Sequence, residues 1–177
     1  GTTEFYQQTS RLFNSQSLIM ISVALVEPEI PPNTGNIARL CAATRTPLHI
    51  VGPAGFRLDD RAVRRAGLDY WPEVMLERHR DFAALRASLT LGDARARFVF
   101  LTTKVKRSYL DWQFGEHDCL VFGSETRGLP EQLLSANQEH CLTIPILNPK
   151  VRSLNLATSV AIVLYEALRQ TSGLKIS

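Results

Sequence analysis

The chain has 177 residues, of which 45% are hydrophobic and 21% charged, and its formal net charge is +3. These values are typical of a soluble globular protein with one sizeable core, and the length is too short for two ordinary domains. No apolar run reaches the roughly 18 residues that a membrane-spanning helix needs, which excludes a membrane-embedded protein.

The first 19 residues are rich in Gln, Ser and Thr and lack the basic and apolar regions of a signal peptide. We expect residues 1–19 to be a leader or an expression remnant that precedes a single domain of residues 20–177. The three cysteines, Cys41, Cys119 and Cys141, are odd in number and widely spaced. They indicate neither a disulfide framework nor a metal site, and a reducing cytoplasm suits them best.

The first elements alternate strand, helix and strand. Residues 21–27 (ISVALVE) form a β-branched run, which prolines end before a predicted helix from Asn33 or Thr34 to about Thr44. Asn33 and Thr34 are potential caps of that helix. Residues 48–51 predict a second strand, and such a crossover favours a parallel sheet.

The middle of the chain is basic. Residues 59–67 (DDRAVRRAG) predict a helix with an acidic start, and a second helix (81–89) and a buried strand (97–102) follow. Tyr70 and Trp71 form either a packed lid or a surface that stacks a base, and packing is the commoner fate. Arginine forks suit phosphates, although such a cluster is more often a solvated helix face. The cluster consists of Arg57, Arg61, Arg64 and Arg65.

The last third predicts a strand over 118–122, a polar turn from Gly123 to Gly128 and a helix that starts at Pro130. A strand over 142–146 then precedes a polar loop and a helix over 154–168 that is apolar on almost every side. Such a helix must be covered on more than one face, by the sheet and by a partner subunit. Ser153 or Asn155 could cap it. The fold class is therefore α/β, with one mostly parallel sheet and helices on both faces.

Ligands of open α/β sheets gather beyond the carboxyl ends of the strands. Three polar or glycine-rich turns follow predicted strands, at residues 101–103, 123–128 and 144–155, and they converge if their strands are neighbours. The motifs GxGxxG and GxxxxGK[ST] are absent, which argues against a dinucleotide or triphosphate site. A small ligand held without a phosphate cradle remains open.

Three segments carry a family resemblance: PPNTGNIARLCAAT, LVFGSETRGLP and IPILNPKVRSLNLATSVAIVLYEA. In this order they resemble the SPOUT methyltransferases that act on RNA 2′-hydroxyls. Within these enzymes the chain is most similar to the short TrmL family, which methylates the ribose of the tRNA wobble nucleotide, position 34. This likeness rests on the segment RRAGLDYW and on the lack of an added RNA-binding domain. The resemblance covers nearly all of the chain except residues 1–19. It implies a C-terminal trefoil knot, a homodimer and S-adenosylmethionine as methyl donor.

The resemblance also implies the roles of individual residues. Arg39 would act on the ribose hydroxyl, and because a charged guanidinium has no acceptor, stabilising the developing alkoxide is easier for it than removing a proton. Asn33, Glu125 and Asn155 would fix Arg39 and the loops, although Glu125 could instead pair with Arg127, and Asn33 could be a simple cap. No metal is needed, because the donor is a sulfonium. The donor contacts would be Leu101, Thr102, Gly123, Ile144, Ser153 and Leu154.

The expected substrate is the anticodon loop of leucine tRNAs with a cytidine or modified uridine at position 34. Single-stranded loops offer unstacked bases and flanking phosphates. Tyr70 or Trp71 would stack a base, and the arginine cluster would hold phosphates. Two alternatives stay open: a 2′-O-methyltransferase of another tRNA position or of rRNA, and a non-catalytic RNA-binding module of the same fold. A Rossmann-type hydrolase is excluded by the missing glycine motif.

Overall fold

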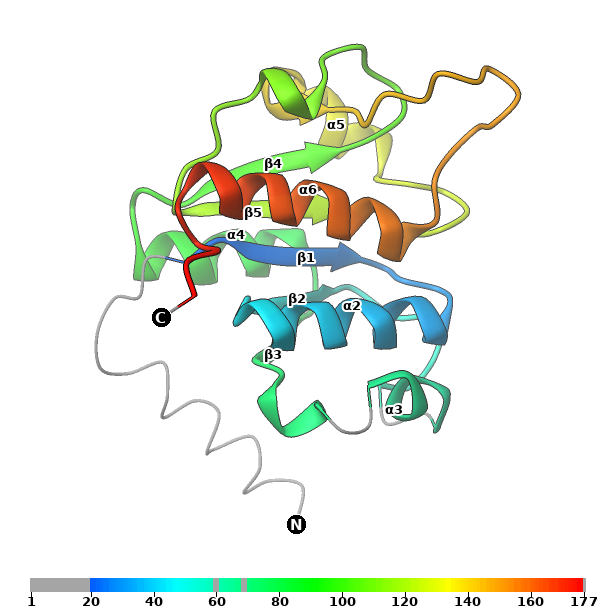
Figure 1. Ribbon diagram of the computed structural model, residues 1–177, viewed down its shortest axis with the longest axis vertical. Helices are drawn as coiled ribbons and strands as arrows, with labels where there is room; N and C mark the ends of the chain where they lie inside the picture. The colour runs from blue at the N-terminus through cyan, green and yellow to red at the C-terminus, as the bar shows by residue number, and fades with distance from the viewer. Residues whose placement is uncertain (1–19, 59–60, 68–69, 177) are drawn as a thin grey trace.

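The structure, a computed structural model, describes residues 20–58, 61–67 and 70–176. The described residues form one six-stranded sheet in which every neighbouring pair of strands is parallel, in the order β3-β2-β1-β5-β4-β6 (Figure 1). The prediction of an α/β fold with a mostly parallel sheet is confirmed. None of the described helices has the length and apolarity to cross a membrane. The strands are β1 (Ser22–Val26), β2 (Leu48–Val51), β3 (Leu76–His79), β4 (Arg97–Leu101), β5 (Asp118–Phe122) and β6 (Cys141–Leu142).

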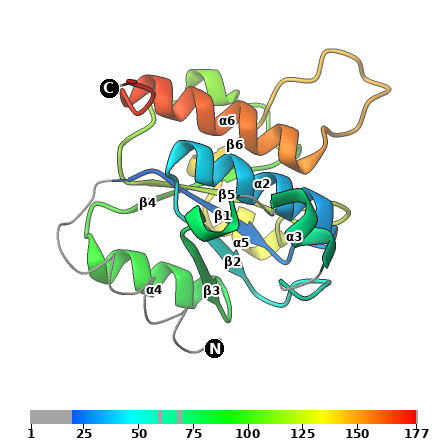
Figure 2. The same ribbon diagram turned by 60° about the horizontal axis from the view of Figure 1, so that its bottom comes forward.

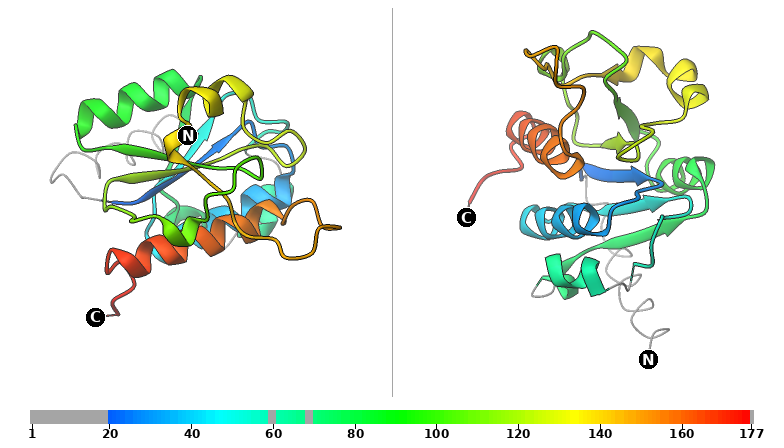
Figure 3. Two further views of the ribbon diagram at one scale, coloured as in Figure 1. Left: turned by 90° about the horizontal axis from the view of Figure 1, so that it is seen from above. Right: turned by 90° about the vertical axis from the view of Figure 1, so that its right-hand side faces the viewer.

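Helices cover both faces of the sheet (Figures 2 and 3). Helices α2 (Pro31–Thr44) and α6 (Leu156–Gln170) lie on one face, where Leu25, Leu120 and Val163 belong to the larger buried core. Helices α4 (Phe82–Gly92) and α5 (Glu131–Ala136) lie on the other, around Phe100. Helix α3 (Arg61–Gly67) packs beside α2. Because both faces are covered, the central strands β1 and β5 are buried at every position, as is typical of parallel sheets.

The start of α2 differs from the prediction. The helix begins at Pro31, and its N-cap Ile30 has no side-chain cap. A proline in the first turn suits a helix start, because its fixed φ matches the helix and its missing N–H is not needed there. Asn33 and Thr34 are therefore buried inside the first turn and do not cap it, so the capping prediction was wrong.

The strand predicted over 142–146 was also wrong in extent, because β6 contains only Cys141 and Leu142. Pro145 has no N–H to give to a ladder, which prevents the strand from continuing. The chain instead runs as a long loop to α6, which begins at Leu156. Asn155 caps that helix, since its side-chain oxygen accepts from Thr158 N at 3.3 Å. The cap predicted at Ser153 or Asn155 is thus confirmed at Asn155.

Three short 3-10 turns, η1 (Trp71–Glu73), η2 (Tyr109–Asp111) and η3 (Gln138–His140), and the edge strand β3 have no counterpart among the predicted elements. The sequence of β3, LERH, contains two charged residues and no β-branched one, so it lacks the usual strand signal. Its parallel pairing with β2 nevertheless extends over four residues. On α6, the sheet-facing side is buried while Tyr165 is 45% exposed. The cover by a partner subunit stays a prediction.

Candidate functional site

A pocket of about 510 Å³ lies at the carboxyl edge of the sheet. Its walls come from the end of β4 and the residues after it (101–104), from the end of β5 and the turn after it (122–129), and from part of the segment between β6 and the first turn of α6 (within 143–159). Ile30 and Asn33 at the start of α2 complete the lining. Strand β4 lies between β5 and β6, so the three segments are brought to one place as the sequence predicted. In Figure 1 this edge is on the right, where the loop before α6 extends from the body. The volume suits a small organic ligand.

Gly123 lets the backbone fold tightly at the end of β5. A Cβ atom built on Gly123 would lie 2.1 Å from the carbonyl carbon of Gly128 and 2.2 Å from Leu129 N, so no other residue fits without moving the turn. Gly128 completes the turn with a φ of +68°, a conformation that favours glycine, and its N–H donates to Ser124 O at 3.0 Å. The missing side chain of Gly123 thus makes room for the returning backbone of Gly128 and Leu129, and both glycines line the pocket.

The segment after β4 is fastened to the segment after β6. Thr102 N donates to Leu142 O at 2.9 Å, and Thr143 N donates to Arg107 O at 2.8 Å. These bonds satisfy backbone groups on both segments and hold Leu101 and Ile144 in the wall of the pocket. The pocket thus combines apolar side chains with backbone groups that are held by the fold.

Glu125 connects the turn after β5 to the start of α2. Its carboxylate accepts from Glu29 N at 2.7 Å and Ile30 N at 3.0 Å, and also from Asn33 Nδ2 at 3.3 Å. A carboxylate at a helix N-terminus satisfies free N–H groups and complements the helix dipole. It holds the two backbone amides that lead into α2, whereas the amides of Asn33 and Thr34 in the first turn donate to Ile30 O. Arg127 faces Glu29, with 4.0 Å between Nε and Oε1, so the alternative of a simple Glu125–Arg127 pair is not what the structure shows.

Glu29 forms the reciprocal connection. Thr126 Oγ1 donates to Glu29 Oε1 at 2.7 Å, and hydrogen bonds from the Thr126 and Ser124 side chains lower the pKa of the Glu29 carboxyl. Two carboxylates, one on each segment, therefore join the glycine turn to the chain before α2. Asn155 adds the third segment, because its Nδ2 donates to Asn33 Oδ1 at 3.0 Å.

All six residues predicted to touch a small ligand line the pocket, and so do Asn33, Glu125 and Asn155. Arg39 does not. It lies six residues after Asn33 in α2, which is about 9 Å along the helix axis. Its guanidinium carbon is 4.9 Å from the ring centroid of Tyr70. The four predicted catalytic residues are thus split into three at the pocket and one outside it.

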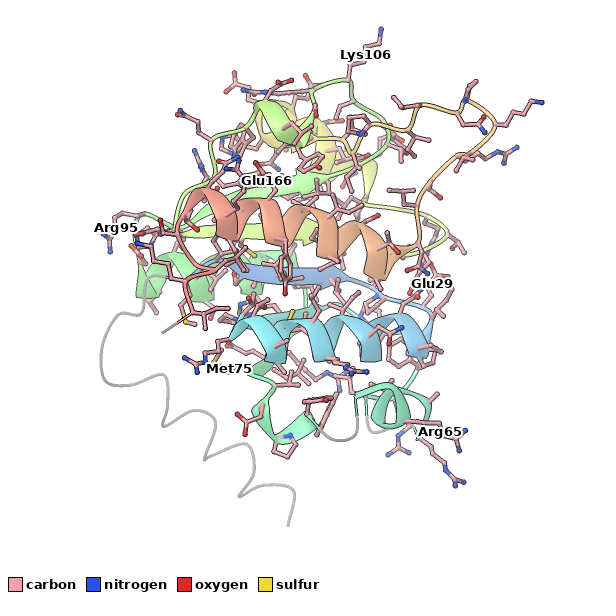
Figure 4. All side chains as sticks on the ribbon, viewed as in Figure 1. Glu29, Arg65, Met75, Arg95, Lys106 and Glu166 are labelled. Carbon is pink, nitrogen blue, oxygen red and sulfur yellow. The ribbon has the colours of Figure 1, made fainter. Side chains whose placement is uncertain are left out.

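The predicted RNA-binding residues lie on and around α3, away from the pocket. Arg57, Arg61 and Arg65 are exposed, and Figure 4 shows Arg65 directed away from the body, whereas the side chain of Arg64 lies outside the described residues. Tyr70 presents a ring face to Arg39, and Trp71 packs against the larger core. Trp71 therefore follows the packing interpretation.

Two basic side chains in the wall of the pocket were not among the predicted site residues. Lys104 follows the Thr102–Thr103 pair, and Arg127 lies in the glycine turn. Both could have been found from their position, because each lies in a turn that directly follows a predicted strand.

The chain matches the profile of the SpoU rRNA Methylase family over residues 20–165. It belongs to this family. The matched part of this SpoU methylase extends from Met20, two residues before β1, to Tyr165 in α6, so it includes every wall of the pocket.

Curated relatives support the assignment. One from Methylovorus glucosotrophus (strain SIP3-4) is 47% identical over 152 residues, which is 85% of this chain and 96% of the relative. One from Escherichia coli (strain K12) is 47% identical over 152 residues, which is 85% of this chain and 94% of the relative. Both are named tRNA (cytidine(34)-2′-O)-methyltransferase.

A solved structure agrees with them. It is described as giving structural insights into the 2-OH methylation of C/U34 on tRNA, and it superposes on this SpoU methylase with a TM-score of 0.81 and 45% identity. The match covers 87% of this chain and 97% of that chain. The family resemblance noted from the three sequence segments is confirmed.

Proposed function

We propose that this SpoU methylase transfers a methyl group from S-adenosylmethionine to the ribose 2′-hydroxyl of tRNA nucleotide 34. The substrates are leucine tRNAs with a cytidine or modified uridine at that position. The observation that carries the proposal is the convergence of the three motif segments on one pocket, in a chain that aligns with nearly the whole length of relatives named for this reaction.

The pocket fits a donor that contains an adenosine. Leu101, Ile144 and Leu154 give apolar surfaces for a purine ring, and the tight turn at Gly123 leaves backbone atoms free to approach the ligand. Thr102 and Ser153 add hydroxyl groups to the wall. The donor, when bound, supplies an electrophilic methyl group on a sulfonium, so the residues need to hold and orient it and no metal is required.

Arg39 acts at the ribose in this proposal. Its guanidinium lies outside the pocket of its own chain, so the protein works as a homodimer in which Arg39 of one protomer faces the pocket of its partner. A stable interface of this kind buries about 1,200 Å² or more in total. Charged arginine donates without accepting, and it holds the adjacent phosphate and stabilises negative charge on the 2′-oxygen. Hydrogen bonds among Asn33, Glu125 and Asn155 hold the walls of the pocket together.

The exposed arginines around α3, together with Arg64, hold phosphates of the anticodon loop. Arginine is suited to this because its fork donates two hydrogen bonds to one phosphate. Tyr70 stacks a loop base on the ring face that Arg39 leaves open. The protein acts in the cytoplasm. The trefoil knot that the resemblance implies stays a prediction.

The test is to incubate the protein with S-adenosylmethionine and total tRNA and to map 2′-O-methyl groups by position. We expect methylation at nucleotide 34 of leucine tRNAs. Methylation confined to rRNA or to another tRNA site would contradict the substrate assignment. Donor binding without transfer to any RNA would favour the non-catalytic RNA-binding module.

A further inference from the structure

A second cluster of polar side chains lies at the β3 edge of the sheet, separated from the pocket strands by β1. Its members are His49 on β2 and Glu77 and His79 on β3. In the parallel register, His49 is opposite Glu77, and His79 is two residues further along β3. Alternate residues of a strand point to the same face, so the three side chains meet. They lie on the face that α4 covers, because His49 is also opposite Ala24, which belongs to the core around Phe100.

The ligand atoms converge on one point. His49 Nδ1 and His79 Nε2 are 2.9 Å apart. The Glu77 carboxylate faces both rings, with Oε2 at 3.7 Å from His49 Nδ1 and Oε1 at 3.9 Å from His79 Nε2. All three groups can place a ligand atom within 4.8 Å of the others. Two imidazole nitrogens and a carboxylate therefore surround a common centre.

The two histidines are buried, and the carboxylate between them and solvent is half-exposed. The His49 and His79 side chains are 2% and 5% exposed. A metal binds the neutral imidazole nitrogen, and the 2.9 Å contact places one nitrogen of each ring next to the other. Glu77 supplies the negative charge, and its side chain is 43% exposed, which leaves a solvent side for entry.

We propose that His49, Glu77 and His79 bind a zinc-class divalent cation that fastens the edge strand β3 to β2. Two nitrogens and one carboxylate oxygen suit Zn²⁺ or Co²⁺ and do not suit Mg²⁺ or Ca²⁺, which prefer oxygen ligands throughout. A tetrahedral ion with bonds of about 2.0–2.1 Å separates its ligands by about 3.3 Å. The nitrogens must move apart by roughly 0.4 Å, and one oxygen of the half-exposed Glu77 carboxylate must move closer to both of them, which side-chain rotation on an edge strand provides.

The buried thiols do not compete for the ion. Cys41, Cys119 and Cys141 are free and buried, and burial raises the pKa of Cys41 and Cys119 to about 12, so these two remain protonated. Thiolate is the form that binds zinc, which leaves the histidine cluster as the proposed centre.

The test uses the full chain after treatment with chelator and dialysis. Co²⁺ is titrated while its ligand-field absorption is followed, and Zn²⁺ is titrated by calorimetry. We expect one ion per chain with tetrahedral Co²⁺ bands, which Zn²⁺ abolishes by displacement. At 100 times the dissociation constant, Zn²⁺ should raise the melting temperature by several degrees, while Mg²⁺ should not.

Variants identify the site. Glu77→Gln changes a half-exposed side chain and should leave the fold intact while weakening Co²⁺ binding by about 10-fold or more. His79→Gln should abolish the tetrahedral bands. His117→Gln is the matched control, because His117 pairs with one carboxylate, Asp93, outside the cluster, and it should bind Co²⁺ like the unmodified chain. A folded wild-type chain that binds no Co²⁺ or Zn²⁺ would overturn the proposal. Binding that survives both Glu77→Gln and His79→Gln would do the same.

Discussion

Asn155 Nδ2 donates a hydrogen bond of 3.0 Å to Asn33 Oδ1, although the two residues are 122 positions apart in the chain. The same Asn155 accepts from Thr158 N through its oxygen and so caps α6. One amide thus fixes the start of the last helix and fastens it to the first turn of α2. Asn33 in turn donates a hydrogen bond from Nδ2 to Glu125 Oε1 at 3.3 Å.

Substitutions at Asn155 should separate the cap from the link. Asn155→Ala loses both, and we expect a loss of about 1–2 kcal/mol in the free energy of unfolding together with weaker binding of S-adenosylmethionine. Asn155→Asp keeps an oxygen for Thr158 N but no longer donates to Asn33. It should restore most of the stability without restoring donor affinity. Urea denaturation and calorimetry measure the two effects, and unchanged affinity in Asn155→Asp would remove the link from the site.

Gly123→Ala should disrupt the pocket, because the added methyl group would overlap Gly128 and Leu129 backbone atoms. We expect loss of donor binding and a lower melting temperature. Gly92→Ala is the control, since nothing lies within 4 Å of a Cβ at the end of α4. Differential scanning calorimetry with and without donor compares them. A Gly123→Ala variant that binds the donor with wild-type affinity would show that the turn does not form the site.

Arg97 and Asp118 form the most buried two-bond ion pair of the described residues. Arg97 Nε and Nη2 donate to the two carboxylate oxygens of Asp118 at 2.8 Å each, and the Asp118 side chain is 2% exposed. The hydrogen bond to Asp118 raises the pKa of Arg97. Arg97→Leu leaves the carboxylate buried without its cation and should cost about 3 kcal/mol. The double variant Arg97→Leu, Asp118→Asn should recover part of that loss in urea denaturation, and a larger loss in the double variant would contradict this account.

Glu166 gives the chain an acid-sensitive contact. Hydrogen bonds from Arg169 and then Gln170 lower the pKa of the Glu166 carboxyl to about 2. Since the folded-state pKa is below the usual 4.5, the contribution to stability is complete above pH 4.5 and is lost as pH falls from about 4.5 to about 2. Glu166→Gln should reduce that pH dependence by less than about 1 kcal/mol, because the partner Arg169 is exposed.

The control for Glu166 is Glu131→Gln, which removes an exposed carboxylate that lies 3.7 Å from Lys104. It should change the free energy of unfolding little, because both partners of this ion pair are exposed. Equal effects of the two substitutions between pH 4.5 and 2 would show that the contacts of Glu166 do not set its titration.

Arg39→Ala should separate donor binding from methyl transfer. Arg39 lies outside the pocket lining, so donor affinity should stay near that of the wild type. Loss of a charge-stabilising group at the ribose should lower the transfer rate by about 10²-fold or more. Single-turnover assays with radiolabelled donor measure the rate, and wild-type turnover would exclude Arg39 from the mechanism.

The sequence located the pocket because its walls are turns that directly follow strands, and strand ends are readable from apolar runs and glycines. Gly123 and Ile144 could be placed in this way. The partners of Asn33 could not be predicted from the sequence, because a capping role explains an asparagine near a helix start equally well. Only the fold brings Glu125 to Asn33. The histidine cluster was invisible for a related reason. It depends on β3, a charged strand without β-branched residues, and on a register between strands that no local pattern specifies.

The sheet order also determines when the pocket can form. Strand β6 joins the sheet outside β4, and the segment that follows it supplies the last wall. A chain that ends before Leu142 contains β1 to β5 but has no such wall. Contacts between segments far apart in sequence form slowly, because the intervening loop must close first. Donor binding should therefore be the last property gained during refolding or synthesis, and the kinetics of donor binding can report completion of the fold.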